Sequence, residues 1–224
     1  MLLVVGAVYI AAVAGLGSCS LWIPRRRASG GTLGTCPVCG DHQSVSFTYS
    51  TWPYFWLVAT LLMSALIGAF VAIAVATTGV PGLAVGIGLM LLTLGLVWFL
   101  VVLLRLAPGR VSLCRTGLYH RSLNFTHVLP WFSVYEVSAE WIGSPLIVAK
   151  AYPADGAHVR RYTGRFGTQE MQFLPFMTVR ARWLAADATA VFYALRFYLE
   201  NPELRTELGT TAALSRIHSG SLNS

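Results

Sequence analysis

One short motif in the sequence has the residue types and spacing of a metal site, Cys36-Pro37-Val38-Cys39-Gly40. Two thiolates across a Cys-x-x-Cys turn can hold one side of a zinc ion, and a closed structural site then needs a second pair of ligands. No second Cys-x-x-Cys follows in the chain. Three interpretations therefore stay open for Cys36 and Cys39: half of a zinc site, a redox pair, or an ordinary structural loop.

The ligands that this zinc site lacks would have to come from other parts of the chain. The loop would fold onto the downstream domain, or two chains would each donate a pair of thiolates. Zinc is the only cofactor that the sequence suggests. The side chains that could complete the site are His42, Cys114, His120 and His127.

No other cluster has the spacing of a catalytic site. The five histidines and nine acidic residues do not form a Ser-His-Asp arrangement, an HExxH helix or a phosphate-binding loop. The nearest acidic pair, Glu136 and Glu140, projects from the solvent face of one expected strand. We therefore expect a protein that is not an enzyme and has no small-molecule substrate.

Arginines supply nearly all of the positive charge, since the formal net charge is +7 and the sequence has a single lysine, Lys150. One group of arginines could lie side by side in a curved sheet and attract anionic lipid headgroups, each contributing about 1 kcal/mol. The alternative is a solvated rim. This group consists of Arg160, Arg161, Arg165, Arg180 and Arg182. Nucleic acid is not expected as a partner, because the cluster Arg25–Arg27 borders an apolar segment.

Two long apolar runs divide the chain. Tyr54–Val75 and Leu83–Leu104 contain no Asp, Glu, Lys, Arg or His. Each reaches the length of about 20 residues that a membrane-spanning helix needs. The short turn Thr77–Gly82 joins them, so we expect a transmembrane helical hairpin over residues 54–107.

A third apolar segment, Met1–Ile23, allows three interpretations. A cleaved signal peptide would have positive charge before its apolar core, and a lipoprotein would use Cys19. A membrane anchor fits best, because Arg25–Arg27 would keep its carboxyl side in the cytosol. The anchor predicts three spans in the cytoplasmic membrane, with the amino terminus outside and both the loop 24–53 and the carboxyl-terminal domain in the cytosol.

Small residues recur every four positions along the spans, a spacing that lets helices approach closely in lipid. The alternative is chance, because apolar helices of this composition contain many alanines and glycines. We expect Ser64, Gly68 and Ala72 to line a contact between spans. The other positions are Ala76 on the same helix, Ala7, Ala11 and Gly15 on the first, and Ala84 and Gly88 on the third.

Residues 108–209 have the pattern of a β-rich domain. Two apolar runs within residues 111–121 flank a Thr116-Gly117 turn and predict a hairpin. Apolar residues alternate along Tyr135–Trp141 and again along Phe176–Trp183, so one face of each strand should be buried. On the first of these strands, the residues expected on the buried face are Tyr135, Val137, Ala139 and Trp141.

One amphipathic helix follows the strands. Asp187 is a candidate N-cap, and apolar residues recur at spacings of three and four up to Leu199. Asn201-Pro202 should end this helix and begin a further helical turn. We expect residues 210–224 to form a flexible tail.

The stretch from Gly117-Leu118-Tyr119 to Val128-Leu129-Pro130-Trp131-Phe132-Ser133-Val134 resembles the bacterial pleckstrin-homology-like (PH-like) domain. In that family a Gly-Leu/Ile-Tyr strand is followed by an Ile/Leu-Pro-Trp-x-x-Ile/Val turn. The resemblance covers residues 108–209 and implies a β-barrel with one carboxyl-terminal α-helix, fused to membrane spans as in actinobacterial proteins. The sequence lacks the Lys- and Arg-rich first loop through which eukaryotic members bind inositol phosphates.

These features predict a non-enzymatic, multi-pass membrane protein with a cytosolic PH-like barrel. We expect the barrel to serve as a protein-binding or assembly module, as in an accessory subunit of a membrane complex. The expected partners are membrane lipids and other membrane protein subunits. Two alternatives are a zinc- or redox-responsive regulator acting through Cys36 and Cys39, and a protein that binds anionic lipid.

Overall fold

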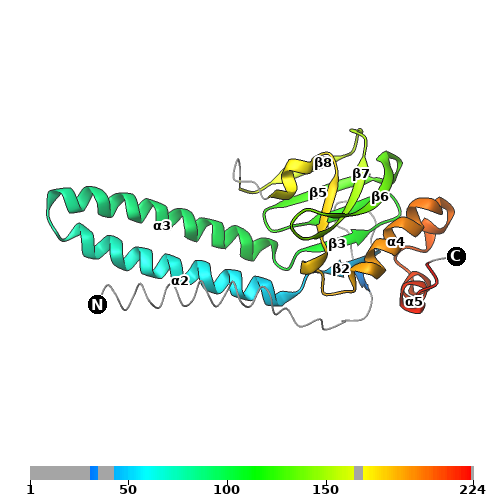
Figure 1. The fold of residues 1–224 in the computed structure, drawn as a ribbon, viewed down its shortest axis with the longest axis horizontal. Helices are drawn as coiled ribbons and strands as arrows, with labels where there is room; N and C mark the ends of the chain where they lie inside the picture. The colour runs from blue at the N-terminus through cyan, green and yellow to red at the C-terminus, as the bar shows by residue number, and fades with distance from the viewer. Residues whose placement is uncertain (1–30, 35–42, 164–168, 223–224) are drawn as a thin grey trace. The chain divides into compact units, whose positions relative to one another are not determined.

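The computed structural model describes residues 31–34, 43–163 and 169–222 of the chain. They belong to two compact units, one built from Thr51–Ala107 and the other from residues up to Ser50 together with those from Pro108 onward (Figure 1). The expected first span, Met1–Ile23, lies outside the described residues. Both long helices belong to the first unit, and all of the described strands belong to the second.

The first unit consists of α2 (Thr51–Ala76) and α3 (Val80–Leu106). These helices have 26 and 27 residues, or about 40 Å each, whereas the hydrocarbon core of a bilayer is about 30 Å thick. Gly79, at φ 110°, forms the turn between them in a conformation that glycine adopts freely. Only 11% of the apolar stretch of each helix is buried. The expected pair of helices, long and apolar enough to cross a membrane, is confirmed.

Small residues form the contact between α2 and α3. A Cβ atom added to Gly68 would lie 2.7 Å from the hydroxyl oxygen of Thr93 on α3. Ala72 is buried, and a Cβ atom added to Gly86 of α3 would lie 2.8 Å from the Ala72 carbonyl oxygen. Ser64, four residues before Gly68, is half-buried. The two backbones therefore approach each other most closely where side chains are smallest.

The two small residues of α3 that the sequence pattern singled out do not line the contact with α2. Ala84 and Gly88 are exposed, whereas Gly82 and Gly86 are buried. The spacing of four residues is correct, but the contact face is displaced by two positions. The sequence could not distinguish the two faces, because α3 carries small residues at this spacing on both.

The larger sheet of the second unit has six antiparallel strands in the order β1-β2-β3-β4-β5-β8. In that order, the strands are Thr32–Gly34, Ser44–Thr48, Arg110–Leu113, Gly117–Arg121, Phe125–Pro130 and His158–Arg161. The expected hairpin within residues 111–121 is confirmed as β3 and β4. β1 and β2 lie in the segment expected to be a loop, residues 24–53. The β-rich domain therefore starts before the long helices and not at residue 108.

A smaller antiparallel sheet contains β6 (Val134–Trp141), β7 (Pro145–Ala151) and β9 (Met177–Arg180) in the order β6-β7-β9. β9 is shorter than expected, because residues 181–183 form a 3₁₀ turn, η3. The described strands thus form two separate sheets, and no closed barrel is seen.

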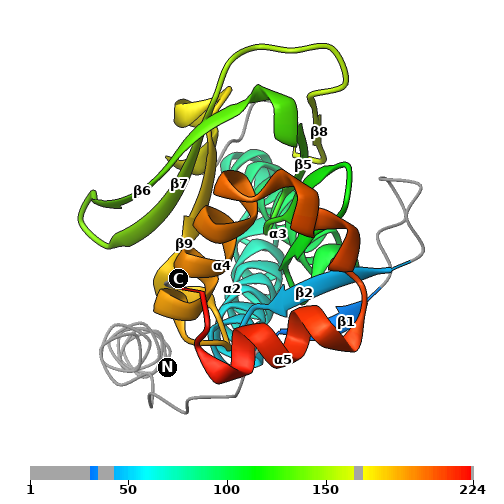
Figure 2. The same ribbon diagram turned by 90° about the vertical axis from the view of Figure 1, so that its right-hand side faces the viewer.

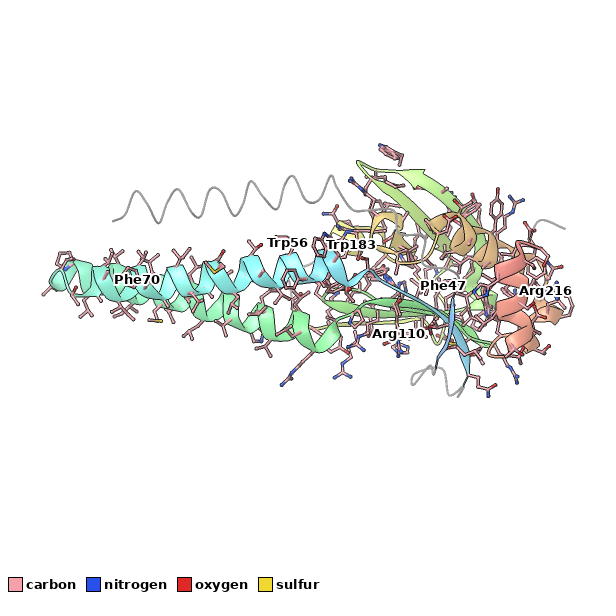
Figure 3. All side chains as sticks on the ribbon, turned by 90° about the horizontal axis from the view of Figure 1, so that it is seen from below. Phe47, Trp56, Phe70, Arg110, Trp183 and Arg216 are labelled. Atoms are coloured by element: carbon pink, nitrogen blue, oxygen red, sulfur yellow. The ribbon has the colours of Figure 1, made fainter. Side chains whose placement is uncertain are left out.

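Buried side chains lie on both faces of each sheet. On the smaller sheet, Ile147, Ala149, Met177 and Val179 are all at most 4% exposed. One face of the larger sheet is mixed: Tyr119 and Val128 are buried on it, and so are Ser46 and Ser112, whose hydroxyl oxygens are 2.8 Å apart. On the inner face of the larger sheet, the apolar residues at most 1% exposed are Val45, Phe47, Val111, Leu113, Leu118 and Leu129 (Phe47 is labelled in Figure 3).

Helix α4 (Ala188–Glu200) follows the strands as expected. The N–H of Thr189 donates to Asp187 Oδ1 at 3.0 Å, which confirms the N-cap. A 3₁₀ segment, η4 (Pro202–Glu207), begins at the expected proline. Figure 2 shows α4 between the strands of the two sheets.

The expected flexible tail contains a helix, α5 (Thr211–Ser219), so this prediction is wrong. Ile217 is only 4% exposed. Arg216 Nε and the Tyr198 hydroxyl both donate to Glu207 Oε1, each at 2.8 Å, and thereby tie α5 and α4 to η4. Figure 2 shows α5 beside β1 and β2.

Candidate functional site

The predicted zinc ligands Cys36 and Cys39 lie outside the described residues. Within the part of the chain that the structure describes, no group of three His, Cys, Asp or Glu side chains could hold a metal ion. Cys114, a candidate for a further ligand, is fully buried, and the Trp131 indole N–H donates to its backbone oxygen at 2.7 Å. The zinc site stays a prediction.

His120 of β4 and His127 of β5 lie directly opposite each other on the inner face of the larger sheet. The Tyr49 hydroxyl is 2.7 Å from His120 Nε2, within hydrogen-bonding distance. Burial, reinforced by His127, lowers the pKa of His120 to about 3, and burial with His158 nearby lowers the pKa of His127 to about 4. Both imidazoles are neutral and enclosed in the core, so we assign them a structural role.

Glu170 joins the two sheets. It lies on the short segment η2 (Gln169–Phe173) and is only 5% exposed. The Ser122 hydroxyl, just after β4, donates to Glu170 Oε2 at 2.6 Å, and Arg180 Nε at the end of β9 donates to Glu170 Oε1 at 2.7 Å. Burial raises the pKa of Glu170 above its usual range, although both partners act in the opposite direction.

A buried carboxyl group with a raised pKa is a candidate general acid or base. Both Glu170 oxygens are already bound within the protein, however, and the depression beside it has a volume of only about 10 Å³, room for about one water molecule. We therefore interpret Glu170 as a structural residue that links the two sheets through Ser122 and Arg180. The other residues around the depression are Ile142, Ser144, Leu146, Phe173 and Arg180.

The arginines expected to bind lipid lie on different parts of the domain. Arg160 and Arg161 are on β8, an edge strand of the larger sheet, and both are exposed. Arg180 belongs to the smaller sheet and is bound to Glu170, while Arg182 is exposed on η3. Arg165 lies outside the described residues. The structure thus places two of the four described arginines on the larger sheet, one on the smaller sheet and one on η3, and not along one sheet.

Two exposed tyrosine rings pack together where β6 begins and β7 ends, and another exposed aromatic residue, Phe132, lies three positions before Tyr135 in the chain. The rings of Tyr135 and Tyr152 have centroids 4.6 Å apart and are 45% and 64% exposed. Phe132, in the 3₁₀ turn η1 (Trp131–Ser133), is 76% exposed. The Tyr152 N–H donates to the Ser133 oxygen at 2.9 Å, which holds the two segments together. We call Phe132, Tyr135 and Tyr152 the tyrosine surface.

A second exposed aromatic residue lies at the other end of β6. Trp141 is 75% exposed at the turn between β6 and β7, where Gly143 has φ 66°. Trp141 lies six positions after Tyr135, which corresponds to about 20 Å along a strand. Trp141 is therefore distant from the tyrosine surface.

The sequence pattern missed the tyrosine surface because it placed Tyr135 and Trp141 on a buried face. A β-bulge between Val134 and Glu136 breaks the alternation, so Tyr135 does not share the buried face of Val137. Trp141 lies beyond the part of the hairpin that β9 covers. Gly143 and Pro145 marked that turn and could have indicated its exposure.

Comparisons of this chain with protein-family models, with curated proteins and with solved structures find no match. The functional assignment therefore depends on the geometry of the described residues.

Proposed function

We propose that this chain is a non-enzymatic membrane protein whose β-rich domain binds a protein partner through the tyrosine surface. The observation that carries the proposal is the exposed, packed pair of Tyr135 and Tyr152, with the exposed Phe132 three positions before Tyr135 in the chain. The partner is another subunit of a membrane complex, to which this chain contributes an accessory binding module.

Aromatic side chains suit this role because they supply a large contact area at a small cost in conformational entropy. Tyrosine and tryptophan are enriched among the residues that dominate binding energy at protein interfaces. The Tyr135 and Tyr152 rings pack on each other, and this contact restricts the conformations of both side chains. In contrast, the buried groups that could do chemistry, His120 and Glu170, are engaged inside the domain.

Short links support attachment of this domain to a membrane. β2 ends two residues before α2 begins, and β3 begins three residues after α3 ends. Each residue spans at most about 3.6 Å, so a hairpin that crosses the bilayer would keep the domain at its surface. The arginines after each expected inner end, Arg25–Arg27 and Arg105, favour the cytosolic side of the cytoplasmic membrane.

The PH-like resemblance is part of this proposal. Its support is the order of elements, antiparallel strands followed by the amphipathic helix α4. Among the described residues the strands form two open sheets, so the barrel that the resemblance implies stays a prediction.

The test is a crosslinking experiment in native membranes that carry the full chain. We expect a defined partner to co-isolate with the wild type, and the double variant Tyr135→Ala, Tyr152→Ala to reduce its recovery more than tenfold, because each interface tyrosine can contribute about 2 kcal/mol.

The matched control is Trp141→Ala, which removes an aromatic ring that is still more exposed, at the other end of β6. It should leave recovery of the partner unchanged. Equal recovery with the tyrosine variant and the wild type, or equal loss with the tryptophan control, would rule out the tyrosine surface as the binding site.

A further inference from the structure

Three aromatic rings pack together in the first two turns of α2. Phe55 and Trp56 follow Trp52 by three and four residues, so the three side chains share one face of the helix. The centroids of the Trp52 and Phe55 rings are 6.2 Å apart with the rings stacked, and the Trp56 ring meets the two edge-on at 5.8 and 5.7 Å. Trp52 is 45% exposed and Phe55 is 59% exposed. We call Trp52, Phe55 and Trp56 the aromatic cluster.

The aromatic cluster lies at the charged end of the hairpin. Gly68 of α2 lies against Thr93 of α3. Ala72, further along α2, lies against Gly86, which is earlier on α3, so the two helices are antiparallel. The start of α2 is therefore beside the end of α3. The only charged residue in either helix, Arg105, belongs to that last turn of α3.

The opposite end of the hairpin is apolar and uncharged. Val80, at the start of α3, is 84% exposed. The Thr77 hydroxyl donates to the Ala74 oxygen and the Thr78 hydroxyl to the Val75 oxygen, each at 2.8 Å. The side-chain donors of the turn are thus bonded within the protein, which is the condition for contact with lipid.

The length of α2 determines where the aromatic cluster lies relative to a bilayer. A helix that crosses the hydrocarbon core, about 30 Å thick, needs about 20 residues at 1.5 Å per residue. Since α2 has 26 residues, about six of them lie outside this core when the helix crosses it. The turn is apolar and the other end carries Arg105, so the residues outside the core are the first ones, 51–56. The aromatic cluster is then at the depth of the lipid headgroups.

We infer that the aromatic cluster is a docking site for phospholipid headgroups, with Trp52 and Phe55 among the glycerol esters and phosphates of the leaflet at that end. Tryptophan suits this depth, because its ring is apolar and its N–H can donate to lipid oxygens. Trp56 Nε1 is buried and has no hydrogen-bond partner among the described residues (Trp56 is labelled in Figure 3). The hydrocarbon core contains no acceptor for such a donor, whereas the headgroup level contains ester oxygens and water.

The inference depends on the membrane crossing in the proposed function and not on the tyrosine surface. It sets the aromatic cluster apart from Trp98 of α3, which is 49% exposed. Trp98 lies within about 20 residues of Val80, so it should be in the hydrocarbon core. Trp98 is therefore a matched control for Trp52, with the same residue type, nearly the same exposure and a different depth.

The test is the tryptophan fluorescence of the full chain in phosphatidylcholine vesicles that carry a nitroxide quencher. The nitroxide is either on the lipid headgroup or in the middle of an acyl chain. Trp52→Phe should lower quenching by the headgroup nitroxide about twofold more than quenching by the acyl-chain nitroxide. Trp98→Phe should have the opposite preference. Both variants keep an aromatic ring, and an unchanged Tm would show that both keep the fold.

A second measurement identifies what lies against the aromatic cluster. A photoreactive phenylalanine analogue replaces Phe55 in one sample and Phe70 in another, in native membranes that carry the full chain. Phe70 is the matched control, since it is 53% exposed and belongs to the part of α2 expected in the hydrocarbon core (Phe70 is labelled in Figure 3). We expect irradiation to give adducts of phospholipid mass from both positions and a protein adduct from neither.

The variants also separate this inference from the protein partner. Tyr135→Ala, Tyr152→Ala should keep the nitroxide quenching of the wild type, because the tyrosine surface is not part of the aromatic cluster. Trp52→Phe should keep recovery of the protein partner. Loss of one property without the other thus shows which of the two proposals fails.

Three results would overturn the inference. Equal effects of Trp52→Phe and Trp98→Phe with both nitroxides would remove the difference in depth. No effect of Trp52→Phe with either nitroxide would place Trp52 outside the lipid. A discrete protein adduct from position 55, without a lipid adduct, would make the aromatic cluster a protein-binding surface.

Discussion

At the scale of single residues, the buried histidines make stability depend on pH. Native His120 has a pKa lowered to about 3 by burial and by His127, whereas an unfolded histidine has its ordinary pKa of 6.5. Between these values the unfolded state binds more protons than the native state, so the free energy of unfolding falls as the pH is lowered from 6.5.

The variant His120→Gln tests this prediction, because glutamine does not titrate and can hydrogen-bond to the Tyr49 hydroxyl. We expect a lower Tm at pH 7.5 but a smaller further loss between pH 7.5 and 4.5 than in the wild type. His218→Gln on the exposed face of α5 is the matched control and should keep the wild-type slope. Parallel curves for His120→Gln and the wild type would contradict a neutral, buried His120.

Little of the candidate site could be predicted residue by residue from the sequence. Alternation along residues 135–141 correctly buried Val137, but it could not reveal the bulge that exposes Tyr135. The pairing of His120 with His127 likewise depends on the register of β4 and β5. The residue types and spacings of a single sequence do not show which residues of two strands lie opposite each other.

At the scale of elements, the contact between α2 and α3 depends on glycines, and Gly86 of α3 is the one that can be tested most directly. A Cβ atom on Gly86 would lie 2.8 Å from the Ala72 carbonyl oxygen and from Ala76 Cβ. Gly86→Leu should therefore separate the helices and destabilise the hairpin by about 1–3 kcal/mol, as overpacking does. Gly88→Leu, two residues away, meets nothing within 4 Å and should leave Tm in detergent unchanged. Equal Tm values for the two variants would contradict this contact.

The elements that could be predicted are those with the strongest periodicity. The two long helices, the β3–β4 hairpin and α4 follow from uninterrupted apolar runs, a Thr-Gly turn and an N-cap. The elements that were missed are short or mostly polar: β1 has three residues, β2 alternates serine with apolar residues, and α5 buries only Ala213 and Ile217. Their stability comes from tertiary contacts, which local sequence does not show.

At the scale of the whole molecule, the chain enters its β-rich domain, leaves it for the helical hairpin and returns. The hairpin α2–α3 is inserted between β2 and β3, which pair directly with each other. Two short links thus join the units. The β-rich domain is therefore discontinuous in sequence, with one part before the hairpin and the rest after it.

The most direct test of this account is a site-specific photo-crosslink in intact membranes. A photoreactive phenylalanine analogue replaces Tyr152 in one sample and Trp141 in another, two exposed aromatic positions at opposite ends of the β6–β7 hairpin. We expect irradiation to give one discrete protein adduct from position 152 and none of that mass from position 141. No adduct from position 152, or the same adduct from both positions, would contradict a binding module that acts through the tyrosine surface.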